Sequence, residues 1–156
     1  MIQIIKGDLL ASDERFIAHG CNTMGAMHAG IADQIRKKYP LVFHAYKREL
    51  SGRFVPGYAQ MVAVGPERTV FNLATQDYTG PHARLEWVYL AFRNMAEICA
   101  VYNIQRVAIP EIGCGLGGLS WSDVEMSILS ATAFSVTRGN NLEIVCYVYK
   151  PPRAPR

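Results

Sequence analysis

The sequence predicts one α/β domain, with helices covering both faces of a central sheet. Apolar stretches of strand length alternate with stretches of helical periodicity along the 156 residues. Most of the apolar stretches are continuous, which is typical of strands buried on both faces. Half of the residues are hydrophobic and 19% are charged. A chain of this length and composition can bury a core without disulfides or a metal, so it is neither a disordered segment nor a miniprotein scaffold.

Six apolar segments and three helical segments make up this pattern. The expected strands cover residues 2–6, 16–19, 58–64, 69–75, 106–112 and 142–149. Apolar residues recur at steps of three and four over residues 84–102, which predicts a helix. Ser120 and Asp123 form a capping-box pattern, so a second helix should begin after Ser120. A third helix is expected over residues 30–38, where Pro40 either ends it or starts another.

The charge is balanced outside the C-terminal end. Sixteen Lys and Arg against 13 Asp and Glu give a net charge of +3, and three of the basic residues are Lys150, Arg153 and Arg156. A neutral body argues against a broad nucleic-acid-binding surface, which needs a clustered basic excess. We therefore expect a domain over residues 1–150 and a basic, proline-rich tail over residues 151–156.

The four cysteines lack the close pairs that zinc sites use. Cys21, Cys99, Cys114 and Cys146 are separated by 78, 15 and 32 residues. No stretch approaches the roughly 18 apolar residues of a membrane span, and the first residues do not resemble a secretion leader. The sequence thus predicts free thiols in the cytoplasm, no metal and no membrane partner.

A glycine-rich loop, residues 113–118, follows a predicted strand and precedes a predicted helix. Ligands bind at such turns in α/β proteins, because glycines let backbone N–H groups approach a phosphate. The loop formally matches G-x-G-x-x-G, but it follows the penultimate strand, and Glu143 is misplaced for a ribose-binding acid. No Gly-Lys-Ser/Thr follows, as a Walker loop requires. On its own, the loop is either a tight turn or an anion site.

Two further segments carry polar groups that suit a nucleotide. Residues 19–30 form a loop in which Asn22 can hydrogen-bond a sugar hydroxyl, while Gly25 and Gly30 permit close approach of the backbone. Asp8 follows the first predicted strand, and its carboxylate could accept hydrogen bonds from the amino group of adenine. The alternatives are an Asx turn at Asn22 and a helix N-cap at Asp8.

These segments combine into a more specific pattern. Its motifs are Gly7-Asp8-Leu9, His19-x-x-Asn22 and Ile112-Gly113-Cys114-Gly115-Leu116-Gly117-Gly118-Leu119-x-Trp121. The pattern resembles the macro domain family over about residues 2–149, in particular the compact branch of terminal ADP-ribose protein glycohydrolases and DNA ADP-ribosyl glycohydrolase antitoxins. The resemblance implies a three-layer α/β/α fold with a mixed central sheet and a cleft for ADP-ribose at the strand ends.

The resemblance also implies a function. The protein would bind ADP-ribose, need no cofactor and act as a hydrolase on an ADP-ribose derivative. The expected reaction removes mono-ADP-ribose from a protein or nucleic acid. The alternatives are an ADP-ribose 1″-phosphate phosphatase and a non-catalytic reader of ADP-ribose.

Matching positions assign the parts of ADP-ribose to residues of this chain. Asp8 would bind the adenine and Tyr149 would flank it, and Leu9 would be a further ligand-binding residue. Asn22 would face the distal ribose. The backbone around the diphosphate and the distal ribose would come from Gly25, Gly30, Ile31, Gly113, Cys114, Gly115, Leu116 and Gly117.

Two positions depart from the glycohydrolases of this branch. Gln76 stands where they carry a lysine that can attack the sugar, and glutamine is a poor nucleophile. Gly117 stands where the terminal ADP-ribose glycohydrolases carry an aspartate, although the antitoxin-like members also carry glycine. Gln76 therefore favours a reader or a phosphatase over a lysine-dependent glycohydrolase.

Four side chains remain as candidates for assisting hydrolysis: Asn22, His19, Asp77 and His82. Asp77 or His82 could act as a general base, or Asn22 could position water against the ligand. His19 matches a histidine that is implicated in a fungal macro domain phosphatase. The structural alternatives are an exposed loop position for His82 and a hydrogen-bonded core position for His19.

Overall fold

The computed structural model describes residues 1–149, so the predicted tail, residues 151–156, lies outside the described residues. Six strands form one sheet in the order β1-β6-β5-β2-β4-β3. The strands are β1 (Gln3–Lys6), β2 (Phe16–Asn22), β3 (Ala59–Gly65), β4 (Arg68–Gln76), β5 (Arg106–Ile109) and β6 (Glu143–Val148). The helices are α1 (Gly30–Lys38), α2 (Pro40–Glu49), α3 (Leu85–Tyr102), α4 (Trp121–Thr132) and the 3-10 helix η1 (Ala133–Arg138). Within residues 1–149, no helix is long and apolar enough to cross a membrane.

The sheet is mixed, as the resemblance implies. Neighbouring strands pair in parallel from β1 through β4, and only β3, at the edge beside β4, runs antiparallel. The five parallel strands therefore end along one edge of the sheet, where α/β proteins bind their ligands. The segments that follow these strands meet at that edge, namely residues 7–10, 23–29, 77–83, 110–118 and 149.

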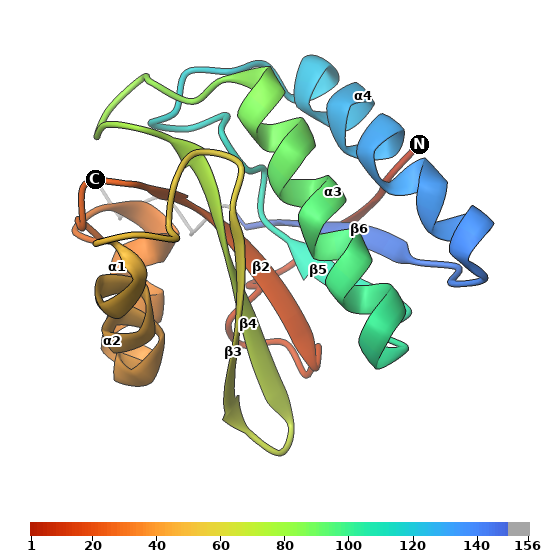
Figure 1. The fold of residues 1–156 in the computed structure, drawn as a ribbon, viewed down its shortest axis with the longest axis horizontal. Helices are drawn as coiled ribbons and strands as arrows, with labels where there is room; N and C mark the ends of the chain where they lie inside the picture. The colour runs from red at the N-terminus through yellow and green to blue at the C-terminus, as the bar shows by residue number, and fades with distance from the viewer. Residues whose placement is uncertain (150–156) are drawn as a thin grey trace, which may run out of the picture.

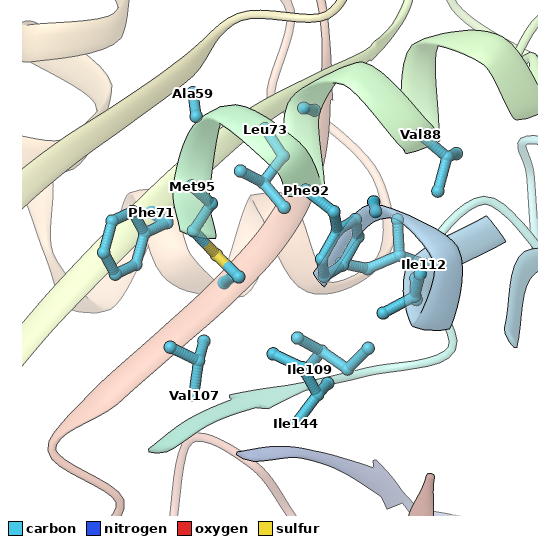
Figure 2. Close-up of a cluster of buried hydrophobic side chains, with 14 of the residues drawn as sticks. Ala59, Phe71, Leu73, Val88, Phe92, Met95, Val107, Ile109, Ile112 and Ile144 are labelled. Carbon is cyan, nitrogen blue, oxygen red and sulfur yellow. The ribbon is translucent and has the colours of Figure 1, made fainter. Parts of the chain in front are cut away.

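Helices cover both faces of the sheet, which confirms the predicted fold class (Figure 1). α1 and α2 lie over β2, β3 and β4 on one face, whereas α3 packs on the opposite face with α4 beside it. In the core under α3, the fully buried Phe92 and Met95 pack with Phe71 of β4 and Val107 of β5 (Figure 2). Burying such side chains contributes roughly 1.5–3 kcal/mol each to the stability of the fold.

Local sequence signals explain where the helices begin and end. The hydroxyl of Ser120 accepts a hydrogen bond from the backbone N–H of Asp123 at 3.5 Å, which confirms the predicted start of α4. α3 ends at Tyr102, and the following residue, Asn103, caps it in a left-handed conformation with φ 55°. Pro40 lies in the first turn of α2, where helix N–H groups have no partner in any case, so it starts a second helix.

β5 is shorter than predicted. The expected strand ran to residue 112, whereas β5 ends at Ile109. Pro110 has no N–H for the ladder, and the N–H of Ile112 turns back to the carbonyl of Pro110 at 2.8 Å. The chain thus leaves the sheet early, and Pro110 and Glu111 become part of the surface at the strand ends.

Candidate functional site

Two adjoining cavities open at the carboxyl ends of the parallel strands. The first has a volume of about 420 Å³, and its walls come from the end of β2, the start of α1, the end of β4 and the segment after β5. The second has a volume of about 250 Å³ and lies where β1 and β6 end. Ile31, Pro110 and Glu111 line both cavities, so together they form one elongated cleft.

The loop of residues 113–118 presents unpaired backbone donors to the first cavity. It is closed by a hydrogen bond from the N–H of Leu119 to the carbonyl of Gly113 at 2.8 Å, with Gly113 at a positive φ of 76°. Within residues 1–149, no protein acceptor binds the N–H groups of Gly113, Gly115, Leu116 and Gly117. All four residues line the cavity, and such convergent N–H groups suit an anion.

α1 directs its N-terminus into the same cavity. Its N-cap residue is Ala29, which has no side chain that could accept a hydrogen bond from the first turn. Gly30, Ile31 and Ala32 line the cavity, and the N–H groups of a first helical turn have no partner within the helix. An uncapped helix N-terminus with its positive dipole end is a second group of donors for an anion.

Asn22 organises the loop between β2 and α1. Its side-chain Oδ1 accepts hydrogen bonds from the N–H groups of Met24 at 3.0 Å and Ala26 at 3.3 Å, and lies 2.9 Å from the hydroxyl of Tyr46. Its Nδ2 donates to the carbonyl of Ala26 at 2.8 Å. The Asx turn considered from the sequence is therefore present, yet Asn22 also lines the first cavity. The second hydrogen on Nδ2 has no protein acceptor within residues 1–149.

Asp8 lies in the second cavity. Its Oδ1 accepts a hydrogen bond from the N–H of Leu10 at 3.0 Å, which fixes the carboxylate in place. Within the described chain no protein group donates to Oδ2. Tyr149 lines the same cavity, so the structure brings together the two residues that the resemblance assigns to adenine, and Leu9 lines this cavity as well.

His19 lies in β2, buried on the face of the sheet that α2 covers and deeper than the first cavity. Its Nε2 is 2.5 Å from Oδ1 of Asn72. Nδ2 of Asn72 donates to Oε1 of Gln60 at 2.9 Å, and Nε2 of Gln60 donates to the carbonyl of Ala45 at 2.8 Å. His19 is fully buried and does not line either cavity. Its geometry is that of the hydrogen-bonded core histidine considered as the structural alternative.

Burial of His19 makes the stability of the fold depend on pH. Loss of hydration lowers the pKa of His19 from 6.5 to about 4. The unfolded chain therefore binds a proton below pH 6.5 that the folded protein does not, and stability falls as the pH drops from 6.5 toward 4. Between pH 7 and pH 5 we expect a loss of about 2 kcal/mol from this group. Urea unfolding at pH 7 and pH 5 measures this loss of stability. In His19→Gln the contribution of His19 should vanish, and a loss equal to that of the parent would contradict the lowered pKa of His19.

The comparisons with known proteins agree with this geometry. A sequence model described as "Macro domain" matches residues 18–128. The chain belongs to the macro domain family. The solved macrodomain of DarG from Mycobacterium tuberculosis is 29% identical in sequence, with a TM-score of 0.81 over 94% of this chain and 97% of that structure. The macrodomain of DarG from Thermus aquaticus is 25% identical, with a TM-score of 0.80 over 97% and 99% of the two chains.

Relatives of this macro domain carry different activities in their names. The protein named DNA ADP-ribosyl glycohydrolase from M. tuberculosis is 31% identical over 135 residues, which are 84% of this chain and 38% of that protein. This chain thus spans less than half the length of that relative. The protein named ADP-ribose 1″-phosphate phosphatase from Candida albicans is 28% identical over 143 residues, 82% of this chain and 92% of that protein.

Several predicted residues of this macro domain lie near the first cavity without lining it. Asp77 and His82 are exposed in the segment after β4, where His82 forms an edge-to-face pair with Tyr78. Cys114 lies within the glycine loop, and its thiol is 3.4 Å from the carbonyl of Ile112. Burial raises the pKa of this thiol to about 11, which disfavours a nucleophilic thiolate. Gly25 donates its N–H to the Tyr46 hydroxyl at 2.9 Å, so this hydrogen bond fixes the loop between β2 and α1 against α2.

Other lining residues of this macro domain were missed from the sequence. Thr79 and Gly80 line the first cavity and belong to residues 77–83, which we name the wall segment. His28 and Glu111 are the exposed ionisable side chains among the described lining residues. These four lining residues lie in the segments that follow the parallel strands β2, β4 and β5, and this position is the signal that could have identified them.

Proposed function

We propose that this macro domain binds ADP-ribose along the two adjoining cavities and hydrolyses the bond that links mono-ADP-ribose to a macromolecule. The observation that carries the proposal is the convergence of two groups of unpaired N–H donors, from residues 113–117 and from the start of α1, on the first cavity. A diphosphate between them would satisfy both groups. The adjoining cavity, with Asp8, would then take the adenine.

The reaction in this proposal uses water as the nucleophile. Gln76 lines the first cavity at the position where a glycohydrolase of this branch carries lysine, and a neutral amide does not attack the sugar. Asn22 of β2 is the register partner of Gln76 on the neighbouring strand β4, and its free Nδ2 hydrogen can orient water or a ribose hydroxyl. The N–H groups of the glycine loop would bind the phosphates and so fix the distal ribose, while water adds to its C1 carbon and the departing group of the macromolecule takes up a proton from that water. Asp77 and His82 do not line the first cavity, so the proposed reaction does not use them.

The names of the relatives support hydrolysis of an ADP-ribose derivative. They leave two candidate substrates, an ADP-ribosylated macromolecule and ADP-ribose 1″-phosphate. A relative that is 31% identical is named DNA ADP-ribosyl glycohydrolase. A relative that is 28% identical, and similar in length to this chain, is named ADP-ribose 1″-phosphate phosphatase. A phosphatase that uses His19 would need that side chain in the cavity, whereas it is buried beneath α2. This position favours release from a macromolecule.

The proposal predicts that the purified protein releases free ADP-ribose from an ADP-ribosylated macromolecule, and that the release continues in EDTA because the proposed mechanism uses no metal. ADP-ribosylated protein, ADP-ribosylated DNA and ADP-ribose 1″-phosphate are incubated in parallel, and chromatography follows free ADP-ribose and phosphate. ADP-ribose released only with phosphate would identify a phosphatase instead. If all three substrates stay intact while calorimetry shows binding of ADP-ribose, the protein is a reader.

A further inference from the structure

The side chain of Gln76 forms hydrogen bonds with backbone carbonyls of the segment that follows it. Gln76 is the last residue of β4, and its Nε2 donates to the carbonyl of Tyr78 at 2.6 Å and lies 3.4 Å from the carbonyl of Gly80. The backbone of Gln76 also forms an antiparallel bridge with Ala83. The amide therefore lies inside the wall segment and joins its start to its middle.

The wall segment connects the two glycine-containing loops of the cleft. On one side, the hydroxyl of Thr23 donates to the carbonyl of Asp77 at 3.2 Å. On the other, the N–H of Ala83 donates to the carbonyl of Gly117 at 3.3 Å. Thr79 and Gly80, between these two tethers, line the first cavity. A change in the wall segment would thus move the cavity lining and its contact with the phosphate-binding loop together.

We infer that Gln76 is a positioning residue, which holds the wall segment in the shape that lines the distal end of the first cavity. The inference rests on the proposed binding of ADP-ribose. Both partners of Nε2 are carbonyl oxygens, so the position requires a side chain that donates hydrogen bonds. An amide meets this need and so does a lysine, whose ammonium group donates three hydrogen bonds on a stem one bond longer. Leucine has a similar volume and donates none.

Hydrogen exchange of the ligand-free protein tests the inference without any ligand or turnover. We expect the backbone N–H groups of His82 and Ala83 to exchange about tenfold faster in Gln76→Leu than in the parent. Gln76→Lys should recover most of this protection because it restores a donor. Unchanged exchange in Gln76→Leu, or equal loss in both variants, would overturn the role of the donor. Thermal midpoints measured alongside verify that both variants are folded.

Binding measurements connect the wall segment to the ligand. We expect Gln76→Leu to weaken ADP-ribose about tenfold and AMP less than twofold, because AMP lacks the distal ribose that the wall segment would contact. Gln76→Lys should recover the affinity for ADP-ribose. Equal weakening of ADP-ribose and AMP would contradict a role confined to the distal end. If the parent binds neither nucleotide, the proposed function fails, while the exchange result still decides whether Gln76 holds the segment.

Discussion

Replacing Gly117 with alanine is expected to weaken the binding of ADP-ribose by about 100-fold. A Cβ at this position would lie 2.7 Å from the carbonyl oxygen of Gly113 and 2.9 Å from the Cβ of Ala83. Both neighbours are fixed, the first because it is backbone and the second because it is buried, so the loop itself must move. The N–H groups that converge on the cavity would then separate, and each hydrogen bond lost to a charged phosphate costs about 1.5–3 kcal/mol.

Gly115→Ala is the matched control for this experiment. A Cβ at Gly115 would meet no atom within 4 Å, so alanine leaves the loop in place. Isothermal titration calorimetry with ADP-ribose should give an affinity within about threefold of the parent for Gly115→Ala and the large loss for Gly117→Ala. Equal affinities in the two variants would show that the loop does not bind the phosphates through its backbone. Thermal unfolding of each variant separates a local change from loss of the fold.

Replacing Asp8 with alanine is expected to weaken ADP-ribose binding by roughly 10- to 100-fold. The Asp8 carboxylate is held by the N–H of Leu10 through Oδ1, and Oδ2 lies without a protein donor in the described chain. A carboxylate only accepts hydrogen bonds, so it suits the amino group of adenine. Removing a charged acceptor from a half-buried position leaves that amino group unpaired.

Ligands that lack adenine, or that lack only its amino group, test the Asp8 assignment. Ribose 5-phosphate lacks adenine, and its affinity should be the same in Asp8→Ala and in the parent. The inosine analogue of ADP-ribose carries a carbonyl where adenine has its amino group, so the parent should bind it more weakly than ADP-ribose and Asp8→Ala should bind both alike. Unchanged calorimetric affinity of Asp8→Ala for ADP-ribose would refute the contact with adenine.

Much of the fold could be predicted because its signals are local. The spacing of apolar residues at three and four positions in α3, and the cap of α4 at Ser120, depend on residues close in sequence. Both helices begin within a residue or two of the expected place. α2 was less clear, because only Val42 and Tyr46 are buried in its ten residues and Pro40 is compatible with either an end or a start. The early end of β5 depends on Pro110, which a continuous apolar run conceals.

The candidate site was predictable in its loops but not in its side-chain directions. Glycine-rich segments after strands indicate a backbone site from sequence alone, and the structure brings residues 113–117 and 25–31 to the same cavity or its edge. The direction of His19 depends on the register of β2, since successive side chains point to opposite faces. β2 is buried on both faces, so no polar alternation distinguishes the face of Ala18 from that of His19. The tertiary partner Asn72 decides what His19 does.

The pairing of β1 with β6 affects how the cleft is assembled during synthesis. These strands are neighbours in the sheet, with Gln3 opposite Val145, although they are the first and last strands along the chain. During synthesis, β2, β4 and β5 leave the ribosome before β6. The strands that border the first cavity are therefore available for pairing while β1 still has no partner strand. Joining segments so distant in sequence is slow, because the entropy of loop closure must be overcome first. The second cavity therefore cannot be completed before β6 is synthesised, and a chain that stops short of β6 would leave Asp8 beside an open sheet edge.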